Sequence, residues 1–297
     1  MRVLLTGGRG LLGAPLAACL RADEADVCVT DVPEVDVTNG AAVRAALDEF
    51  APDVVVHLAA WTDVDACERD PERAHSVNAG GTRYVAEACV AAGARMLYVS
   101  TDYVFDGRSR APYTEADATG PLSAYGRSKL EGERHVRESG VGGWIVRCQS
   151  IYGRGKKSFA DAILLRARAG EELRVVTDQT VCPTYADDLA ALLAATVARA
   201  ADGLYLAANT GSCTWHEFAR AVLDESGFAG LPIAPITAAD LGRDAPRPTN
   251  SRFDCSAIAS AAQHALRPWR DALCEYLAAQ QASAPTATDA ECNGERS

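Results

Sequence analysis

The stretch "MRVLLTGGRGLLG" at residues 1–13 joins a short apolar run to three glycines that recur every third residue, Gly7, Gly10 and Gly13. Glycine permits a tight turn, lets the backbone approach a diphosphate, and allows the following helix to pack close to the strand. The N-terminus of that helix offers free N–H groups to phosphate oxygens. The stretch therefore predicts the opening strand, turn and helix of a dinucleotide-binding α/β fold; an ordinary strand-to-helix turn is the plain alternative.

The first half of the chain repeats this alternation of short apolar runs and helix-length segments. The runs predict buried strands at residues 2–6, 26–31, 53–58, 95–100 and 143–147. Val, Leu and Ile are nearly continuous in them, which implies burial on both faces and hence a parallel sheet between helices such as 41–50 and 74–92. We predict a doubly wound parallel sheet, the Rossmann fold, for residues 1–150.

The second half has a looser pattern beyond Tyr152. Helical periodicity predicts helices at residues 159–169, 185–200, 215–226 and 269–280. We expect residues 151–171 and 209–281 to form a smaller, mainly helical substrate lobe, and residues 172–208 to return to the first domain. The last stretch, "ASAPTATDAECNGERS" at 282–297, contains no large apolar side chain and predicts a disordered tail.

Composition excludes several classes of function. Asp and Glu outnumber Lys and Arg by 40 to 29, for a formal charge of −11, and there is no basic run that would follow a nucleic-acid backbone. No stretch reaches the roughly 18 apolar residues of a membrane span. The ten cysteines form no Cys-x-x-Cys pair and the five histidines no ligand-spaced cluster. We therefore expect reduced thiols, a cytoplasmic protein and no structural zinc.

The glycine turn and the end of the second predicted strand indicate the cofactor. Asp31 lies about twenty residues beyond the turn, where a carboxylate accepts hydrogen bonds from both ribose hydroxyls of a dinucleotide. The same charge repels a 2′-phosphate and so favours NADH over NADPH, although Arg9 could partly compensate. The predicted cofactor contacts in the turn are Gly7, Arg9, Gly10, Leu11, Leu12 and Gly13.

A second motif, "SAYGRSK" at residues 123–129, places Tyr125 and Lys129 four residues apart. On a helix these side chains share one face. The plain interpretation is a solvated amphipathic helix. The sharper one is a fixed cation that lowers the phenol pKa from about 10 toward neutrality, so that the phenol can exchange a proton. The pair alone does not decide between them.

Longer motifs show a resemblance to a known family. They are "DVT" at 36–38, "HLAAWTDVDACE" at 57–68, "STDYVFDG" at 100–107, "DQTVCPTYADDLA" at 178–190 and "RPTNSRFD" at 247–254. With the glycine turn and Tyr-x-x-x-Lys, the sequence resembles the extended short-chain dehydrogenases/reductases, and within them the dTDP-4-dehydrorhamnose reductase family. The resemblance covers nearly the whole chain up to the tail.

The resemblance implies a reductase that uses NADH or NADPH to reduce the 4-keto group of a nucleotide-linked 6-deoxyhexose, with dTDP as the expected nucleotide. Thr101, Tyr125 and Lys129 would converge over the nicotinamide as catalytic residues. Hydride that reaches a carbonyl carbon leaves charge on the oxygen, so a phenol that donates a proton and a hydroxyl that hydrogen-bonds the oxygen both lower the barrier. As bare residues, Thr101 would cap a turn and Tyr125 would be buried structure.

The family also implies further contacts. Its remaining cofactor contacts would be Asp36 and Val37 at the adenine, Ala59, Ala60 and Trp61 along the dinucleotide, and Asn78, a brace for the active-site helix. Its substrate contacts would be Thr101, Asp102, Val104, Ser150, Arg247 and Asn250, with Arg247 facing the diphosphate. Ordinary loop packing is the alternative for these residues.

Two departures from the family bear on the substrate and on a metal. Many members carry Trp where this chain has Ser150, in "RCQSIYG" at 147–153, and Gln149 precedes it. Two polar side chains in place of an aromatic platform put the rhamnose precursor in doubt and admit a differently decorated deoxysugar nucleotide. Some members bind magnesium through a Glu after the glycine turn; Ala14 and Pro15 stand here, so we predict no metal.

Two other functions stay open. A 4-epimerase or dehydratase of the same superfamily would return the hydride to the substrate; Asp102 fits both the reductase and the epimerase or dehydratase, whereas a net consumption of NADH would distinguish the reductase from the other two. A non-catalytic NAD(P)-binding module, as in the regulatory subunit of methionine adenosyltransferase, would bind a protein partner instead. A nucleotide sugar is the expected partner. A homodimer is compatible with the sequence, which does not decide the oligomeric state.

Overall fold

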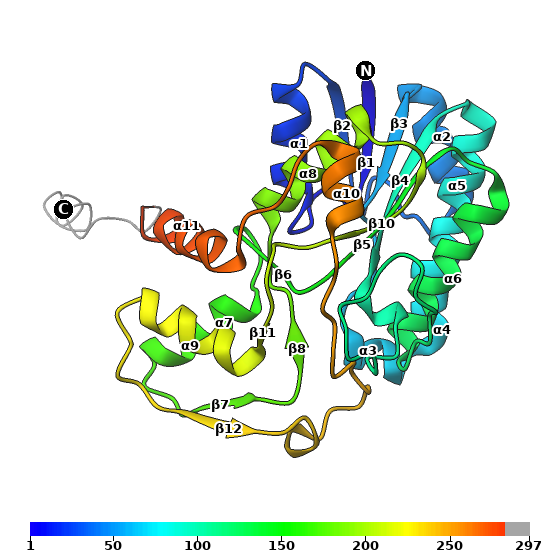
Figure 1. Cartoon of the computed structure of the whole chain (residues 1–297). Coiled ribbons are helices and arrows are strands. Elements are labelled where there is room, and N and C mark those ends of the chain that lie inside the picture. Colours follow the sequence, from blue (N-terminus) through cyan, green and yellow to red (C-terminus); the bar gives the residue numbers. More distant parts are fainter. Residues whose placement is uncertain (283–297) are drawn as a thin grey trace, which may run out of the picture.

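The computed structural model describes residues 1–282 of the 297-residue chain, in which a large sheet region adjoins a smaller helical region (Figure 1). The predicted disordered tail at 282–297 lies outside the described residues, except for Ala282, which ends helix α11 (Trp269–Ala282). Within residues 1–282, no helix has both the length and the apolar character that crossing a bilayer requires.

Within these residues, a six-stranded parallel sheet forms the larger region and confirms the predicted doubly wound fold. Its spatial order is β10-β5-β4-β3-β1-β2, and each neighbouring pair runs parallel. The strands are β1 (Arg2–Thr6), β2 (Asp26–Thr30), β3 (Val54–His57), β4 (Arg95–Thr101), β5 (Gly143–Cys148) and β10 (Gly203–Ala207). Because β1 lies between β2 and β3, the strand order reverses there, and the crevice outside the carboxyl ends of these strands is where such sheets bind ligands.

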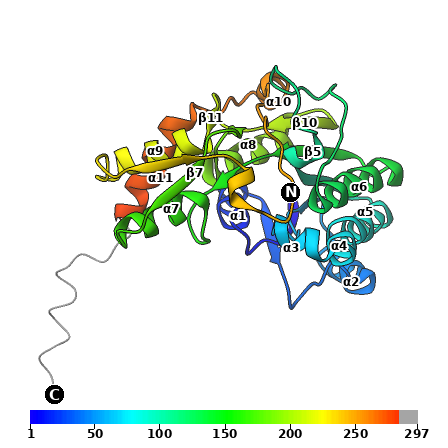
Figure 2. The same cartoon turned by 90° about the horizontal axis from the view of Figure 1, so that it is seen from below.

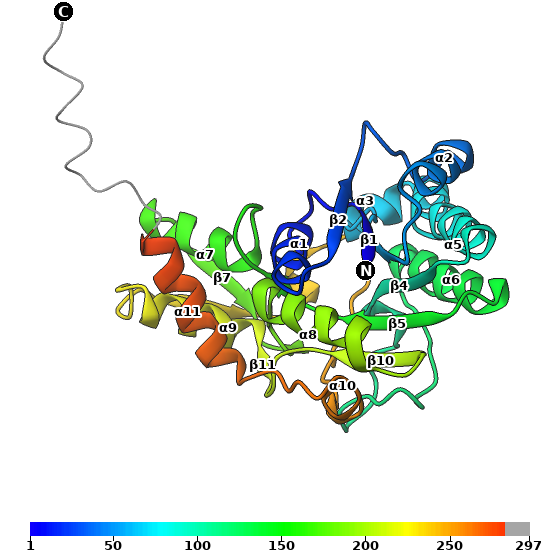
Figure 3. The ribbon, with the colours of Figure 1, turned by 90° about the horizontal axis from the view of Figure 1, so that it is seen from above.

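Helices cover both faces of the sheet (Figure 3). One face carries α1 (Gly13–Ala22), α8 (Ala186–Arg199) and α10 (Ser256–Ala262). The other carries α2 (Gly40–Phe50), α5 (Gly81–Ala92) and α6 (Ala124–Ser139). The side chains of β1 alternate between the two cores, since Val3 and Leu5 join the first and Leu4 joins the second. Burial on both faces explains the continuous apolar runs in the sequence.

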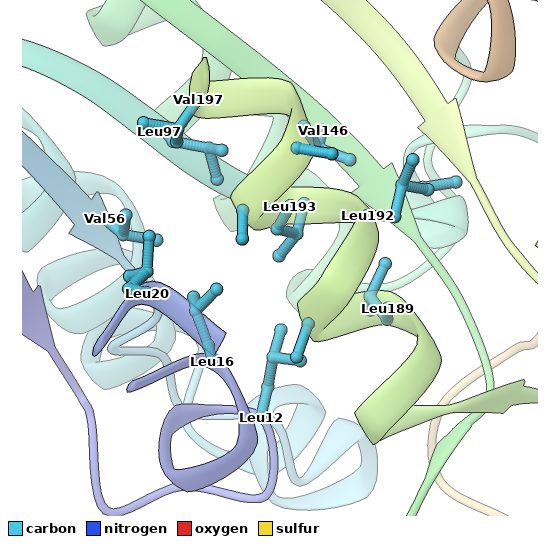
Figure 4. Packing of buried hydrophobic residues seen from close by; sticks show 14 of the residues in the cluster. Leu12, Leu16, Leu20, Val56, Leu97, Val146, Leu189, Leu192, Leu193 and Val197 are labelled. Carbon is cyan, nitrogen blue, oxygen red and sulfur yellow. The ribbon is translucent and has the colours of Figure 1, made fainter. Parts of the chain in front are cut away.

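The core between α1 and α8 positions the glycine turn. Leu12, Leu16 and Leu20 recur every fourth residue; in Figure 4, Leu12 and Leu16 lie on the side of Leu189 and Leu193 of α8, and Leu20 lies beside Val56. All of these side chains are buried. This packing holds α1 against the sheet, so that the start of the helix lies just beyond the carboxyl end of β1.

The helices of the smaller region are seen from below in Figure 2, and their buried side chains form a core rich in aromatic rings. These helices are α7 (Phe159–Arg168), α9 (Trp215–Glu225) and α11. Short strands pair as β6 (Ile151–Tyr152) with β9 (Thr184–Tyr185), β7 (Leu173–Val176) with β12 (Ile233–Ile236), and β8 (Thr180–Val181) with β11 (Cys213–Thr214). The ring of Tyr152 lies 5.7 Å from that of Tyr185, 5.3 Å from Phe218 and 5.2 Å from Tyr276, between centroids.

The packing changes two details of the predicted domain division. The prediction returns residues 172–208 to the sheet region, but β7 pairs with β12 of the helical region, so the return begins near α8. The prediction also places α10 in the helical lobe, whereas its buried Ile258 and Ala262 pack with α8 on the sheet. In both cases the covering element comes from a distant part of the chain. The remaining boundaries of the predicted domain division are still predictions.

The helix predicted at 74–92 is interrupted. This segment contains the end of α4 (Pro71–Ala74), a π-helical turn η1 (His75–Gly80), and α5. Turns of this kind occur often at functional sites. Here η1 packs against α6 and carries the fully buried Asn78. Apolar periodicity does not distinguish such a turn from an α-helix, because both continue the same helical run.

Replacing Gly13 by Ala is expected to lower the free energy of unfolding by about 2 kcal/mol or more, since a Cβ there would overlap the backbone of Gly8 and push α1 away from the sheet. Gly230→Ala is the matched control: beyond its chain neighbours no heavy atom lies within 4 Å of the Cβ position, and the change should stay within about 0.5 kcal/mol. Urea denaturation measures both values. Equal midpoints would contradict the tight packing of the turn.

Candidate active site

A cavity of about 950 Å³ opens beyond the carboxyl ends of β1, β3 and β4. The glycine turn and the residues after β2 line one part of it, and the ends of β4 and β5 with α6 line another. The predicted site residues in its lining are Gly7, Gly10, Leu11, Leu12, Gly13, Asp31, Asp36, Val37, Ala59, Ala60, Trp61, Thr101, Asp102, Tyr125, Lys129 and Ser150. The fold therefore brings most of these residues to one cavity.

Five predicted site residues do not line the cavity: Arg9, Asn78, Val104, Arg247 and Asn250. The guanidinium of Arg9 is turned to Glu34, to which it donates two hydrogen bonds of 2.7 Å. Val104 ends the short 3₁₀ turn η2 (Asp102–Val104) and is fully buried among apolar side chains. Contacts of these residues with a ligand remain predictions.

Arg247 and Asn250 hold the Pro-rich segment against the sheet region. Arg247 Nη1 and Nη2 donate to the two carboxylate oxygens of Asp65 at 3.0 and 2.8 Å, and these hydrogen bonds lower the pKa of Asp65 to about 2. Asn250 Nδ2 donates to the carbonyl of Ser109 at 2.7 Å, and its Oδ1 accepts from Arg252 Nε at 2.9 Å. Both side chains thus make hydrogen bonds within the protein, the guanidinium of Arg247 through its two Nη atoms.

Asn78 connects the loop after β3 to helix α6. Its Oδ1 accepts from the N–H of Trp61 at 2.7 Å, and its Nδ2 donates to the Trp61 carbonyl and to Ser128 Oγ, each at 3.0 Å. Because Ser128 lies within α6, the amide acts as the brace that the family resemblance implies. Contact with a cofactor remains a prediction for this residue.

The glycine turn and Asp31 have the chemistry that a dinucleotide requires. Helix α1 begins without a side-chain cap, so no side chain competes with a phosphate for its first N–H groups. Asp31 Oδ2 accepts from the N–H of Arg9 at 3.0 Å and Oδ1 from the N–H of Val32 at 2.9 Å, which holds the carboxylate beside the turn. Each oxygen keeps a lone pair for a ribose hydroxyl.

Tyr125 and Lys129 share one face of α6, which confirms the predicted helix. Ser123 caps this helix by accepting from the N–H of Gly126 at 3.2 Å. Lys129 Nζ donates to the carbonyl of Val99 on β4 at 2.8 Å. The face that carries the phenol and the ammonium is thereby held against the strand.

Thr101 is the last residue of β4 and brings a hydroxyl to the same part of the cavity. Its Oγ1 donates to Asp102 Oδ1 at 3.1 Å and accepts from the N–H of Tyr103 at 3.3 Å. The second carboxylate oxygen of Asp102 accepts from Ser251 Oγ at 2.5 Å. Thr101 therefore caps a turn, as the plain reading has it, and also faces the cavity.

A buried ion pair fixes α6 to the sheet next to Thr101. Glu133, one turn beyond Lys129, is fully buried; its Oε1 accepts from Ser100 Oγ at 2.6 Å and from Arg147 Nε at 2.8 Å. Its Oε2 accepts from Arg147 Nη2 at 2.7 Å. Burial raises the pKa of Glu133, but the hydrogen bonds and charge of Arg147 outweigh it and leave the pKa below the ordinary value. Neither residue stood out in the sequence, although an acid four residues after Lys129 was a signal.

Burial governs the protonation of the groups at the cavity. It raises the pKa of Tyr125 well above that of an ordinary phenol, so the phenol keeps its proton at neutral pH. This direction is opposite to the sharper reading of a phenol pKa near neutrality, because the loss of hydration outweighs the hydrogen bond with Thr101. Burial also lowers the pKa of Lys129 to about 8 and, despite hydrogen bonds from Ser251 and Thr101, raises that of Asp102 to about 6. At pH 7 the cavity thus presents a neutral phenol, an ammonium and a carboxylate.

The two polar residues that replace the family's aromatic stretch have different roles. Gln149 is buried; its Oε1 accepts from the N–H of Cys182 at 2.9 Å and its Nε2 donates to the carbonyl of Ser251. Gln149 also lines the cavity, with its amide hydrogen-bonded to two backbone groups, and a contact with the sugar remains a prediction for this residue. Ser150 lines the cavity with a positive φ of 47°, a backbone conformation that few residues other than glycine adopt.

Further residues line the cavity that the sequence did not single out. Cys148 pairs with Thr101 across β5 and β4, and the guanidinium of Arg73 lies 4.5 Å from the centroid of the Trp61 ring. Lys156 and Lys157 line it from the turn after β6. The adjacent lysines in "YGRGKKSF" at 152–159 were a signal that could have found them. Among residues 1–282, no three acidic, His or Cys side chains gather as a metal ion would require.

Known proteins are similar to this chain in sequence and in fold. The profile of the RmlD substrate binding domain family matches residues 1–282. A dTDP-4-dehydrorhamnose reductase of Streptomyces griseus is 43% identical over 94% of this chain and 93% of its own. A probable dTDP-4,6-dihydroxy-2-methyloxan-3-one 4-ketoreductase of Streptomyces antibioticus is 38% identical over 93% of this chain and 94% of its own. The crystal structure of dTDP-4-dehydrorhamnose reductase from Bacillus anthracis in complex with NADP is 33% identical, with a TM-score of 0.89, and the match covers 94% of this chain and 99% of that one.

The ammonium of Lys129 is expected to titrate near pH 8, because burial disfavours its charged form. The chain contains only three lysines, so biosynthetic ¹³C-lysine gives a spectrum in which each side chain can be followed by NMR through a pH titration. The Lys129→Met variant identifies the resonance by its disappearance. A Lys129 signal that titrates only near the ordinary value of about 10.4 would contradict the buried position of the ammonium.

Proposed function

This chain belongs to the RmlD substrate binding domain family, and on that premise we propose that it reduces the 4-keto group of a dTDP-linked 6-deoxyhexose with NADH or NADPH. The observation that carries the proposal is the meeting of Thr101, Tyr125 and Lys129 on the cavity that the glycine turn and Asp31 also line. A catalytic set and a dinucleotide site on one cavity are what a nicotinamide-dependent reductase requires. The names of the relatives supply the substrate class.

The dinucleotide would lie along the residues that line the first part of the cavity. The glycine turn and the uncapped start of α1 would receive its diphosphate, and Asp31 the ribose hydroxyls of its adenosine half. Asp36 and Val37 would contact the adenine, and the loop with Trp61 would lie along the cofactor. A bound reduced nicotinamide supplies the hydride. The complex of a relative with NADP supports a nicotinamide cofactor, and the choice between NADH and NADPH rests on Asp31 and Arg9.

The three catalytic residues would act on the ketone oxygen. Tyr125 donates its phenolic proton to that oxygen, and burial keeps the phenol protonated until the oxygen gains charge. Thr101 donates a hydrogen bond to the same oxygen, which lowers the energy of the developing charge. Lys129, charged below about pH 8, stabilises the phenolate that remains and holds a ribose hydroxyl of the cofactor. Asp102 and Ser150 line the adjoining wall and would contact the sugar.

The sugar itself belongs to the same proposal. Ser150 leaves room and a hydroxyl where many family members have Trp, which favours a 6-deoxyhexose decorated differently from the rhamnose precursor. One relative is named as a 4-ketoreductase of another dTDP-linked ketosugar, which supports such variation within the family. We also propose the cytoplasm as the compartment, which the free thiols of the nine cysteines within residues 1–282 support. Sedimentation of the purified chain would decide whether it forms a homodimer.

Wild-type protein is expected to oxidise NADH when it meets a dTDP-4-keto-6-deoxyhexose, with one sugar alcohol formed per NADH. Tyr125→Phe removes the proton donor but little volume, so kcat should fall by about a hundredfold or more while NADH still binds. Tyr205→Phe is the matched control, because that hydroxyl donates to the carbonyl of Ala201 away from the cavity. Absorbance at the nicotinamide band and NMR of the product measure the reaction. Wild-type turnover in Tyr125→Phe would exclude this mechanism, and sugar conversion without net NADH loss would indicate an epimerase.

Glu34→Gln is expected to move the preference toward NADPH by roughly fivefold, the modest effect typical of an exposed ion pair, because it releases the Arg9 guanidinium for a 2′-phosphate. Dissociation constants of NADH and NADPH, from nicotinamide fluorescence, measure the ratio without turnover. The Arg9→Met/Glu34→Gln double variant should lose the gain. Asp31→Asn should favour NADPH by a separate route, since it removes the repelling charge. A ratio that stays constant in both single variants would place cofactor choice elsewhere.

A further inference from the structure

Lysine occurs at only three positions in this chain, and all three side chains line the same cavity. Of 29 basic residues, only Lys129, Lys156 and Lys157 are lysines. Lys129 belongs to the catalytic face of α6. Lys156 and Lys157 are exposed on the turn between β6 and α7, which belongs to the helical region and lies outside the catalytic set.

These two ammonium groups have no carboxylate partner within the described residues, whereas Arg154 and Arg247 do, and Arg73, which lines the cavity, stacks on the Trp61 ring. In the part of the chain that the structure describes, no ion pair within 4.0 Å includes Lys156 or Lys157. Arg154, two residues before, pairs with Asp187 at 2.9 Å. Arg247, the residue expected at the substrate's diphosphate, pairs with Asp65 at 2.8 Å. In a chain with a formal charge of −11, this turn presents two adjacent positive charges to the cavity.

The turn that carries Lys156 and Lys157 starts beside the glycine turn of the sheet region, but it belongs to the helical region. A Cβ added at Gly153 would lie 2.7 Å from Ala186 Cβ and 3.6 Å from Leu11 Cδ1, so the chain leaves β6 in contact with the sheet region. The diphosphate of a dinucleotide has its own donors there, the N–H groups of the glycine turn and of α1. The lysines are therefore available to a second diphosphate in the same cavity.

We propose that Lys156 and Lys157 bind the diphosphate of the nucleotide-sugar substrate, an assignment that rests on the proposed function. A nucleoside diphosphate sugar carries two negative charges on adjacent phosphates, and two neighbouring ammonium groups offer matching charge and three N–H donors each. From this turn the sugar reaches toward Ser150 and the catalytic residues along the cavity wall. The lysines take the role that the resemblance assigned to Arg247.

A second cavity helps to define the control. It measures about 420 Å³, lies along α7, and is lined by Lys156, Lys157 and Arg168. Arg168 does not line the first cavity. Arg168→Gln therefore removes a cation of the same rim that should not meet the substrate, and it serves as the matched control for the lysine variants.

The double variant Lys156→Gln/Lys157→Gln of the full chain is expected to weaken dTDP binding by about tenfold to a hundredfold, since each ammonium makes a charge-assisted contact. Isothermal titration calorimetry measures dTDP, and nicotinamide fluorescence measures NADH, whose dissociation constant should change by less than about twofold. In turnover, KM for the nucleotide sugar should rise while kcat is nearly kept.

Unchanged dTDP affinity overturns the proposal, as does an equal loss of NADH affinity, which would assign the lysines to the cofactor. A loss as large in Arg168→Gln would overturn the placement in the first cavity.

Chemical protection gives a second test that needs no turnover. Acylation with an N-hydroxysuccinimide ester, followed by peptide mass spectrometry, reads each of the three lysines separately. We expect dTDP to protect Lys156 and Lys157, and thymidine and NADH to leave them reactive. Saturating dTDP without protection overturns the proposal. Because dTDP binding does not depend on reduction, a chain that binds dTDP through these lysines but reduces no ketosugar would refute the proposed reaction and leave the diphosphate site standing.

Discussion

The close approach of helix α6 to strand β4 is the constraint on which the site depends. A Cβ at Gly132 would lie 2.5 Å from the Tyr98 hydroxyl, and one at Gly126 would overlap the carbonyl of Tyr103, so the helix lies at a distance that only glycine permits. The buried Glu133 then ties it to Ser100, the residue before Thr101 on β4, and to Arg147 on β5. The relation between Thr101 and the Tyr125 face is thereby set by packing and one ion pair, before any ligand binds.

Burial also sets the charges with which the site works. The phenol of Tyr125 stays neutral and can give a proton, while Lys129 stays cationic at neutral pH although burial opposes its charge. Arg9 and Arg247, which were predicted to contact phosphates, are paired with the carboxylates of Glu34 and Asp65. Lys156 and Lys157 add two cations to the lining of the cavity, which also includes Arg73 and Lys129.

Local sequence is sufficient to predict the structure of a segment whose packing partners lie within the same strand–helix unit. Val3, Leu4 and Leu5 alternate between two cores, and the helix period alone brings Tyr125 and Lys129 to one face. Segments covered by a distant element were misplaced or missed. The strand β7 pairs with β12, and α10 packs on α8, because no pattern within either segment specifies the distant strand or helix that covers it. The π-helical turn at Asn78 was missed for a related reason, since its geometry depends on α6.

The sequence by itself determined the fold class, and it singled out the glycine turn with Asp31 and the three groups Thr101, Tyr125 and Lys129, which the fold brings to one cavity. Only the tertiary structure decided which polar side chains remain available to a ligand. Arg247 and Gln149 look equally free in the sequence, but Arg247 is paired with Asp65 and the amide of Gln149 donates to the carbonyl of Ser251. The reason is that a hydrogen-bond donor pairs with the acceptor nearest in space, and that distance is set by the packing of segments far apart in the chain.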